Sequence, residues 1–426
     1  MRQSLVLVHR WAGLITALFL LIVGLTGAVI AFEEELECWL NPQLFVVTPP
    51  LDAAGRPQPM MDPFELRERT QRALPDHIVN LVRFEREPDR SVLLLARARP
   101  GATVENDQVF VNPYTGEILG MRKRAESLFK RETVVSFIYV LHYSLALPGR
   151  WGTWLLGVIA IVWTVDSFAG FMLTLPRGRP FWSKWSVAWK IKRNAAALRL
   201  NLDLHRAFSL WLFAVLLIFA WSSVMLNLRQ QVYRPVMSTL FEFAPLPDTT
   251  RRSQPLDEPA LDYRAAADAG NKAMQALARE KQFTVNFADN VSYNRAGGFY
   301  IYNANTSRDL VHERGQTLVY IDGNSGATFG ARVPTGEASG DTISRWLQSL
   351  HMAQIFGRPY QIFVAVLGVV VAMLSVTGIV IWWNKRRART VKVRRSVTRP
   401  VPAPSAARWG WRRLRSTARR SDSAHR

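Results

Sequence analysis

Four long apolar runs constrain the fold of this chain more than any other feature. They cover residues 11–32, 151–175, 207–228 and 361–383 of the 426 residues. Each is long enough to cross a hydrocarbon layer of about 30 Å. The first exceeds the apolar core of a typical secretory signal and lacks a small-residue cleavage site before Glu33, so we expect it to stay as an anchor. The sequence therefore predicts a membrane protein with four transmembrane α-helices.

Basic residues set the expected orientation. Residues 177–206 carry eight Lys and Arg against one acid, and residues 385–426 carry fifteen against one, so net charges of +7 and +14 account for the +21 of the chain. Short basic flanks stay in the cytoplasm, which places both termini inside and the segments 33–133 and 229–342 outside. The basic tail could bind RNA, but attraction to anionic membrane lipid is the simpler interpretation, so we expect no nucleic-acid partner.

The two outer segments contain a repeated motif. VFVNPYTGEILG (residues 109–120) matches VYIDGNSGATFG (residues 319–330), and each joins an alternating strand to an Asn/Asp and Gly turn. A helical pattern precedes each motif, DPFELRERTQRAL in the first segment and LDYRAAADAGNKAMQALARE in the second, with further alternating strands between. Each outer segment is therefore predicted to be an α+β unit with one helix and a short antiparallel sheet.

Four histidines repeat in the same order. His9 and His205 each precede an arginine and open an apolar run, whereas His142 and His351 each follow a leucine and precede a Gly-Arg pair. The chain is thus two repeats that enter the membrane in the same direction, which predicts a pseudo-two-fold axis along the membrane normal.

The expected organisation follows from these patterns. It comprises a first span (residues 1–32), an outer domain (33–133), an interfacial helix plus second span (134–176), a basic cytoplasmic loop (177–206), a third span (207–228), a second outer domain (229–342), an interfacial helix plus fourth span (343–384) and a basic, disordered cytoplasmic tail (385–426).

Helix length decides which histidines can share a metal. A 22-residue span is roughly 33 Å long, so His9 and His142 lie at opposite faces, whereas His9 with His205 and His142 with His351 share a level. Two imidazoles without a sulfur ligand suit bis-His haem b better than zinc, because zinc sites in proteins usually have three or four protein ligands. The single cysteine, Cys38, excludes an internal disulfide and thioether haem attachment. We therefore predict two haem b groups with these four axial ligands.

Other polar residues accompany the histidines. Arg10 and Arg206 on the inner side, and Arg150 and Arg358 on the outer side, could bind haem propionates through the guanidinium fork, or could simply anchor the helices at the interface. Asp166 is the one acid within a span. It could ligate the metal, hydrogen-bond a histidine, carry protons or pair with Arg10 or Arg206. In the outer domains, four side chains could face a ligand or pack in the core: Tyr300, Tyr302, Arg295 and Trp346.

The order of these features resembles the PepSY-associated transmembrane family, a group that includes iron-regulated inner-membrane proteins and ferric-siderophore reductases of the FoxB/PiuB type. The resemblance covers residues 1 to about 390. It implies a four-helix core with b-type haem, two periplasmic PepSY domains and location in the bacterial cytoplasmic (inner) membrane. It also implies His9, His205, His142 and His351 as axial ligands. The second repeat departs in detail, since Gly-Arg follows His351 by six residues but His142 by seven.

Two functions from different classes follow. The first is a ferric-siderophore reductase, a haem oxidoreductase that passes electrons from the cytoplasmic side to a periplasmic ferric siderophore and releases ferrous iron. Its electron donor would be a quinol, a reduced flavin or a protein, because the sequence has no nucleotide-binding fingerprint. The alternative is a non-enzymatic, membrane-anchored PepSY protein that binds or regulates a partner. A permease is a poorer fit, because four spans carry no ladder of charges.

Overall fold

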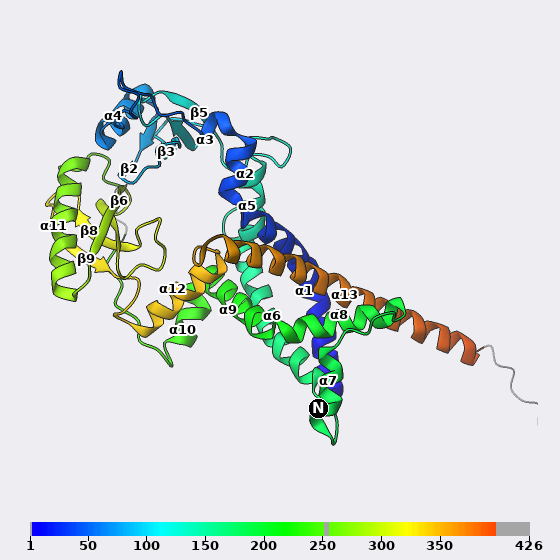
Figure 1. The fold of residues 1–426 in the computed structure, drawn as a ribbon. Coiled ribbons are helices and arrows are strands. Elements are labelled where there is room, and N and C mark those ends of the chain that lie inside the picture. Colours follow the sequence, from blue (N-terminus) through cyan, green and yellow to red (C-terminus); the bar gives the residue numbers. More distant parts are fainter. Residues whose placement is uncertain (1, 251–254, 398–426) are drawn as a thin grey trace, which may run out of the picture. The chain divides into compact units, whose positions relative to one another are not determined.

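The computed structural model describes residues 2–250 and 255–397, with backbone alone for 389–397. Three helices are long and apolar enough to cross a membrane (Figure 1). They are α1 (Arg2–Ile30), α6 (Trp151–Thr174) and α13 (Gly357–Val397), of which residues 357–388 are the candidate span. These helices confirm three of the predicted spans. The continuation of α13 to Val397 also corrects the expected disorder from residue 385, while the rest of the tail lies outside the described residues.

The third predicted span is not one straight helix. It is divided into α8 (Ala197–Trp211) and α9 (Phe213–Asn227), which meet at Leu212 with a bend of 73°. Of the two, only α9 lacks charged residues, and its 15 residues extend about 22 Å, short of a hydrocarbon core. The predicted span 207–228 is therefore not a continuous straight helix. Its first residues belong to α8, an amphipathic helix that carries Arg199, Asp203 and His205.

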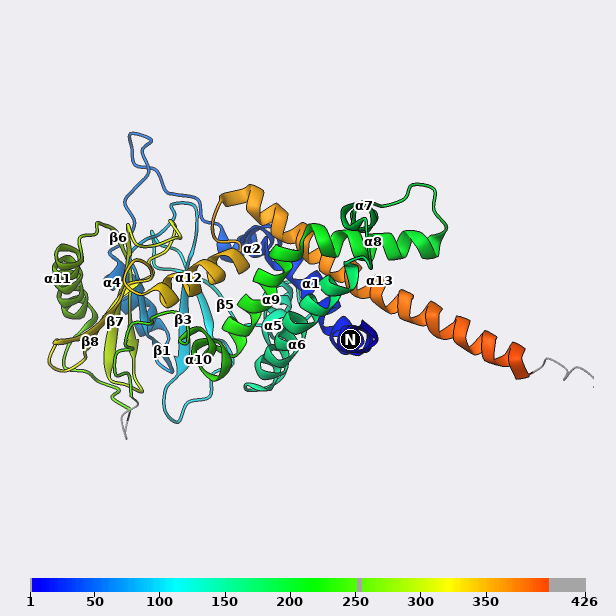
Figure 2. The ribbon, with the colours of Figure 1, turned by 90° about the horizontal axis from the view of Figure 1, so that it is seen from below.

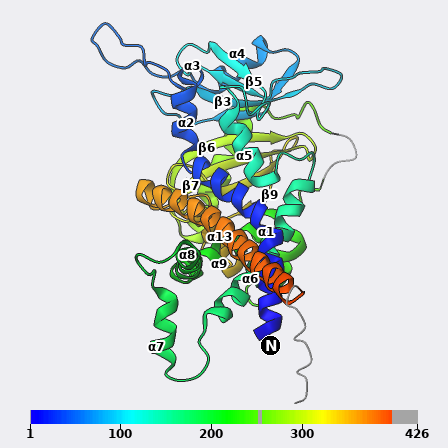
Figure 3. The same ribbon diagram turned by 90° about the vertical axis from the view of Figure 1, so that its right-hand side faces the viewer.

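The membrane helices pack in a repeated pattern. α1 contacts α6 and the short helix α5 (Val134–Ser144), and α9 contacts α6 and α12 (Ser339–His351). α1 and α13 cross where two glycines meet, as Figure 3 illustrates. A Cβ on Gly24 would lie 2.7 Å from the carbonyl oxygen of Gly368, so only a hydrogen permits this approach. The segment α1, α5 and α6 thus corresponds to α8–α9, α12 and α13.

The first outer domain contains a four-stranded antiparallel sheet in the order β1-β3-β4-β5. Its apolar face packs against α4, where Leu66 meets Val79, Leu94 and Val109. The predicted helix and strands are present. The elements are α2 (Glu33–Leu40), α3 (Pro42–Phe45), α4 (Pro63–Ala73), β1 (His77–Val79), β2 (Leu81–Arg83), β3 (Val92–Ala98), β4 (Gln108–Val111) and β5 (Ile118–Arg122).

The second outer domain has a five-stranded sheet, and one strand comes from the first repeat. β2 pairs antiparallel with β6, with Val82 opposite Val291, so the order is β2-β6-β7-β8-β9. The two predicted antiparallel sheets are present, but the second is not built from its own segment alone, because β2 comes from the first. α11 covers one face of this sheet, as Figure 2 shows. The elements are α11 (Tyr263–Lys281), β6 (Val285–Asn294), β7 (Phe299–Thr306), β8 (Thr317–Asp322) and β9 (Thr328–Arg332).

The repeated turn motif adopts the predicted geometry in both copies. The Asn112 side chain accepts from the backbone N–H of Tyr114, and Asp322 accepts from those of Asn324 and Ser325. Gly116 and Gly326 follow with φ of +70° and +72°, a region that side chains rarely adopt. Four short helices connect the larger elements: α7 (Phe181–Ser186), η1 (Val187–Trp189), η2 (Arg229–Tyr233) and α10 (Arg234–Met237).

Candidate functional site

The four predicted histidines meet in two pairs, each with one member from each repeat. The ring centroids of His9 on α1 and His205 on α8 are 6.2 Å apart. Those of His142 on α5 and His351 on α12 are 6.4 Å apart, and both pairs have an interplanar angle of 57°. The pairing predicted from helix length is confirmed.

The two separations suit a single metal between two imidazoles. Metal–imidazole bonds are about 2.0–2.1 Å, and the ring nitrogen lies about 1.1 Å from the ring centre, so trans axial imidazoles have centroids about 6.2–6.4 Å apart. The centroid separation of each pair therefore leaves room for one metal between the two rings.

In all four rings Nδ1 lies within hydrogen-bond distance of an oxygen of a neighbouring helix. Nδ1 of His9 is 3.0 Å from both carboxylate oxygens of Asp166. Nδ1 of His205 lies 2.9 Å from the Thr377 hydroxyl and 3.1 Å from the Leu374 carbonyl oxygen. The carboxylate and the carbonyl can only accept, so these two rings donate from Nδ1.

The outer pair follows the same rule. Nδ1 of His142 is 3.1 Å from the Thr26 hydroxyl, and Nδ1 of His351 is 2.8 Å from the Ser222 hydroxyl. Thr26 and Ser222 each donate their own hydrogen to a backbone carbonyl of the preceding turn, so they can accept from the histidine. In His9 and His205 the partners require hydrogen on Nδ1, and in His142 and His351 the hydroxyl partners allow the same arrangement. An outer partner on the other nitrogen is the usual arrangement of a metal-bound histidine.

Glycines bring three of the rings close to a neighbouring helix. A Cβ on Gly27 would lie 2.9 Å from Cε1 of His142, one on Gly170 would lie 3.2 Å from His9, and one on Gly378 would lie 3.4 Å from His205. A side chain at Gly27 would displace the His142 ring and one at Gly170 would require a small shift of His9, whereas a Cβ at Gly378 would make an ordinary contact with His205. His351 has no such glycine and instead stacks on Phe219 at 5.0 Å.

Asp166 has one of the roles left open by the sequence. It is 7% exposed and bonds to His9, not to Arg10 or Arg206. Among the described residues, no group of three or more His, Cys, Asp or Glu side chains could hold a metal ion. Asp166 thus orients a histidine, and the donor set at each level is two imidazoles. That set fits haem better than zinc.

The four predicted arginines divide into inner and outer members. Arg10 stacks on Trp11, and Arg206 pairs with Asp203, yet both retain a buried Nε without a hydrogen-bond partner. Unpaired guanidinium nitrogens one residue from the inner histidines fit an anionic group such as a propionate. On the outer side, Arg358 is exposed and pairs with Glu35.

Arg150 is exposed as well and stacks on Trp154 at 5.8 Å. Like Arg358, it engages a partner of its own at the start of a span. The geometry therefore favours the two inner arginines over the two outer ones as partners of an anionic group near the histidines.

The hydroxyl partners were missed by sequence reasoning. Thr26, Thr377 and Ser222 lie inside apolar runs, where a polar side chain needs an explanation. A repeated Thr-Gly pair, at residues 26–27 and 377–378, was the available signal, since each pair supplies both the hydroxyl and the close approach.

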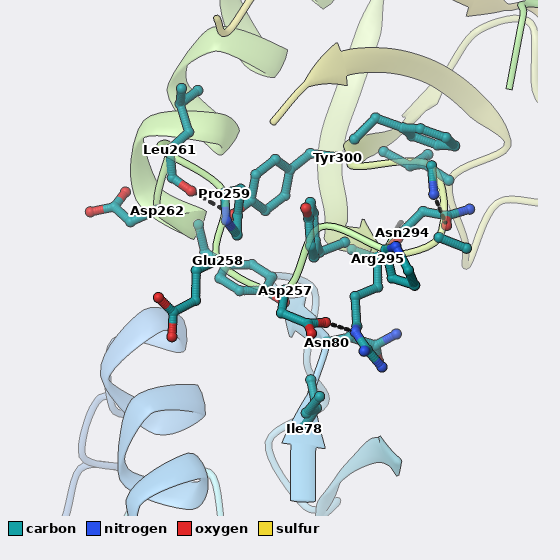
Figure 4. Close-up of a pocket in the computed structure, with 18 of the residues that line it drawn as sticks. Ile78, Asn80, Asp257, Glu258, Pro259, Leu261, Asp262, Asn294, Arg295 and Tyr300 are labelled. Carbon is teal, nitrogen blue, oxygen red and sulfur yellow. Dashed lines mark hydrogen bonds and ion pairs between the residues drawn. The ribbon is translucent and has the colours of Figure 1, made fainter. Parts of the chain in front are cut away.

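A cavity of about 950 Å³ lies in the outer domains, away from the histidines. Figure 4 shows Ile78 and Asn80 of the first repeat on one side and Tyr300 and Arg295 of the second on the other. Two of its polar groups have partners of their own, because Arg295 pairs with Asp257 and the Tyr300 hydroxyl donates to the Leu261 carbonyl oxygen.

Of the four predicted ligand-facing residues, Tyr300 and Arg295 line this cavity. Tyr302 instead packs in the core of the second outer domain, and Trp346 is exposed and lies beside Phe356.

Comparison with known proteins gives one family. The family described as "PepSY-associated TM region" matches residues 6–385, and so covers both repeats and all four paired histidines. No curated protein matches the chain.

Proposed function

Because the chain belongs to the PepSY-associated transmembrane family, we propose that it is a membrane haem-b oxidoreductase that reduces ferric siderophore. It would take electrons on the cytoplasmic side of the inner membrane and deliver them to a ferric chelate in the periplasm, which then releases ferrous iron. The observation that carries this proposal is that one histidine of each repeat meets one of the other at two places, with ring centroids 6.2 and 6.4 Å apart.

Haem b, when bound at these pairs, would supply a one-electron redox centre at each level of the membrane. His9 and His205 would hold the inner group, and His142 and His351 the outer group. Arg10 and Arg206 would bind the inner propionates with their unpaired Nε atoms.

The repeats explain why the ligands come in pairs. Each histidine is oriented by a helix of its own repeat: His9 by α6, His142 by α1, His205 by α13 and His351 by α9. Each pair then forms across the repeats. A change that separates the two halves should therefore empty both levels together.

The test is the optical spectrum and haem content of the purified full chain. We expect b-type bands after dithionite reduction and two haem groups per chain by pyridine haemochrome. His9→Ala and His205→Ala should each remove one group, as should His142→Ala and His351→Ala, whereas His312→Ala, at an exposed outer position, should keep both. Absent bands, or bands that persist when all four histidines are replaced, would reject the proposal and favour a non-enzymatic anchored protein.

Activity has its own test. The chain in vesicles with a reductant inside should reduce an external ferric chelate, detected with a chromogenic ligand for ferrous iron. Variants that lack either histidine pair should lose this reduction while still inserting into the vesicles.

A further inference from the structure

Three arginines gather on the outer-domain side of His351. Arg345 lies on α12 six residues before His351, about 9 Å along the helix. Arg229 lies seven residues beyond Ser222, the partner of His351, just past the end of α9. Arg332 ends β9 and is 3.6 Å from Asp341, one helical turn before Arg345. A hydrogen bond of 3.0 Å between Ser344 and Tyr233 holds α12 against η2.

The three guanidiniums are close enough to affect one another. Burial, together with the Arg332 and Arg229 charges, lowers the pKa of Arg345 to about 10. Burial and the Arg332 charge also lower the pKa of Arg229. Like charges held together in a partly buried position repel one another and raise the free energy of the unliganded site. A bound anion would reduce this repulsion.

Two carboxylates lie near the three arginines. Asp341 forms an ion pair with Arg332 and accepts from the backbone N–H of Ala244. Oδ2 of Asp309 accepts from the backbone and hydroxyl of Thr306, while its Oδ1 is buried without a hydrogen-bond partner among the described residues. Arg345 makes a single 3.3 Å bond to Gln348, and Arg229 has no hydrogen-bond or ion-pair partner within the described part of the chain. Donor groups therefore remain available.

The first repeat lacks this arrangement. Six residues before His142 stands Ser136, and seven residues past Thr26 stands Glu33. The counterpart of Arg332 is Arg122, at the same end of the last strand. Both are paired with a buried carboxylate, Arg122 with Glu37 and Arg332 with Asp341, so the repeats differ at the positions of Arg229 and Arg345. A structural need common to both repeats would not produce a cationic cluster in only one of them.

We propose that Arg229, Arg332 and Arg345 form a carboxylate-binding site at the outer end of the second repeat. The guanidinium fork matches a carboxylate in shape and charge. Two sources offer this chemistry beside His351: a propionate of the outer haem, or a carboxylate of the docked ferric chelate. This inference deepens the proposed function, and its haem-propionate alternative rests on that function.

The experiment measures citrate binding and haem content on the same samples. The full chain is purified as wild type, Arg229→Gln and Arg345→Gln, with Arg279→Gln as the control. Arg279 lies exposed near the end of α11, so its replacement removes the same charge elsewhere. Arg229→Gln breaks no contact that the structure describes, so it serves as the variant least able to disturb folding. Citrate binding is measured by calorimetry, and haem by pyridine haemochrome.

The two sources give different results. If a chelate carboxylate occupies the site, wild type binds citrate, Arg229→Gln and Arg345→Gln weaken it about tenfold or more, and haem content is unchanged. If a propionate occupies it, wild type binds no citrate and both variants lose up to half of their haem.

Variants that match Arg279→Gln in both measurements would overturn the inference. A purified chain without haem would refute the proposed function. The citrate-binding measurement would then still decide whether the three arginines bind a carboxylate.

Discussion

The charge on Asp166 should control the inner histidine pair. Both carboxylate oxygens lie 3.0 Å from Nδ1 of His9, and the side chain is 10% exposed, so little water screens the interaction. Asp166→Asn keeps the size and an acceptor oxygen but removes the charge. The position that corresponds to Asp166 in the second repeat, counted from the Gly-Arg pair, is Leu374. Asp166→Leu therefore gives the first repeat the residue that the second repeat has at this position.

The expected magnitude follows from two estimates that agree. A hydrogen bond to a charged group contributes about 1.5–3 kcal/mol, against about 1 kcal/mol for a neutral one, so loss of charge costs roughly 0.5–2 kcal/mol. Replacement of an outer partner of a metal-bound histidine lowers metal affinity about 10–100-fold, or about 1.4–2.7 kcal/mol. We expect Asp166→Asn to weaken inner haem binding about tenfold and to raise its midpoint potential, because the carboxylate favours the ferric state.

The assay isolates the inner level. Haem is titrated into apoprotein that carries His142→Ala and His351→Ala, and bound haem is read from its absorbance. Thr377→Val is the matched control, since it removes one neutral partner of His205 and leaves the Leu374 carbonyl. The reasoning fails if Asp166→Asn and Thr377→Val have equal effects, or if Asp166→Asn changes only the outer level of the otherwise intact chain.

Three further predictions concern other parts of the chain. Gly27→Val should remove only the outer haem, because its Cβ would lie 2.9 Å from the His142 ring; equal loss at both levels in the haem assay would contradict this. Glu37→Ala should destabilise the outer domain by about 3–5 kcal/mol, because it leaves Arg122 buried and unpaired; Glu37→Ala with Arg122→Met should recover most of the loss in denaturant unfolding. Burial raises the pKa of Asp309 from 3.8 to about 6, so folding favours its protonated form and stability should fall as pH rises from about 4 to 6. Asp309→Asn should flatten that fall in thermal unfolding, and an unchanged slope would refute the assignment.

The sequence was most informative where length and duplication decide the outcome. Helix length alone separates His9 from His142 and pairs His9 with His205, because a span leaves no other pairing within reach of one metal. The turn at Asn112 and Gly116 follows from local chemistry and was also predictable.

Features that depend on packing between distant segments were not predictable. The bend at Leu212 has no proline or glycine to announce it, and β2 joins another sheet through backbone hydrogen bonds that any apolar strand could make. The Arg345 cluster likewise depends on where α12 meets η2, which spacing along the chain does not determine.

The strand exchanged from the first repeat to the second has a consequence for how the protein could be divided. A chain cut within residues 177–206 would leave β2 inserted in the sheet of the other fragment, with Val82 in its core. Two polypeptides encoded by a split gene should accordingly find each other and co-purify.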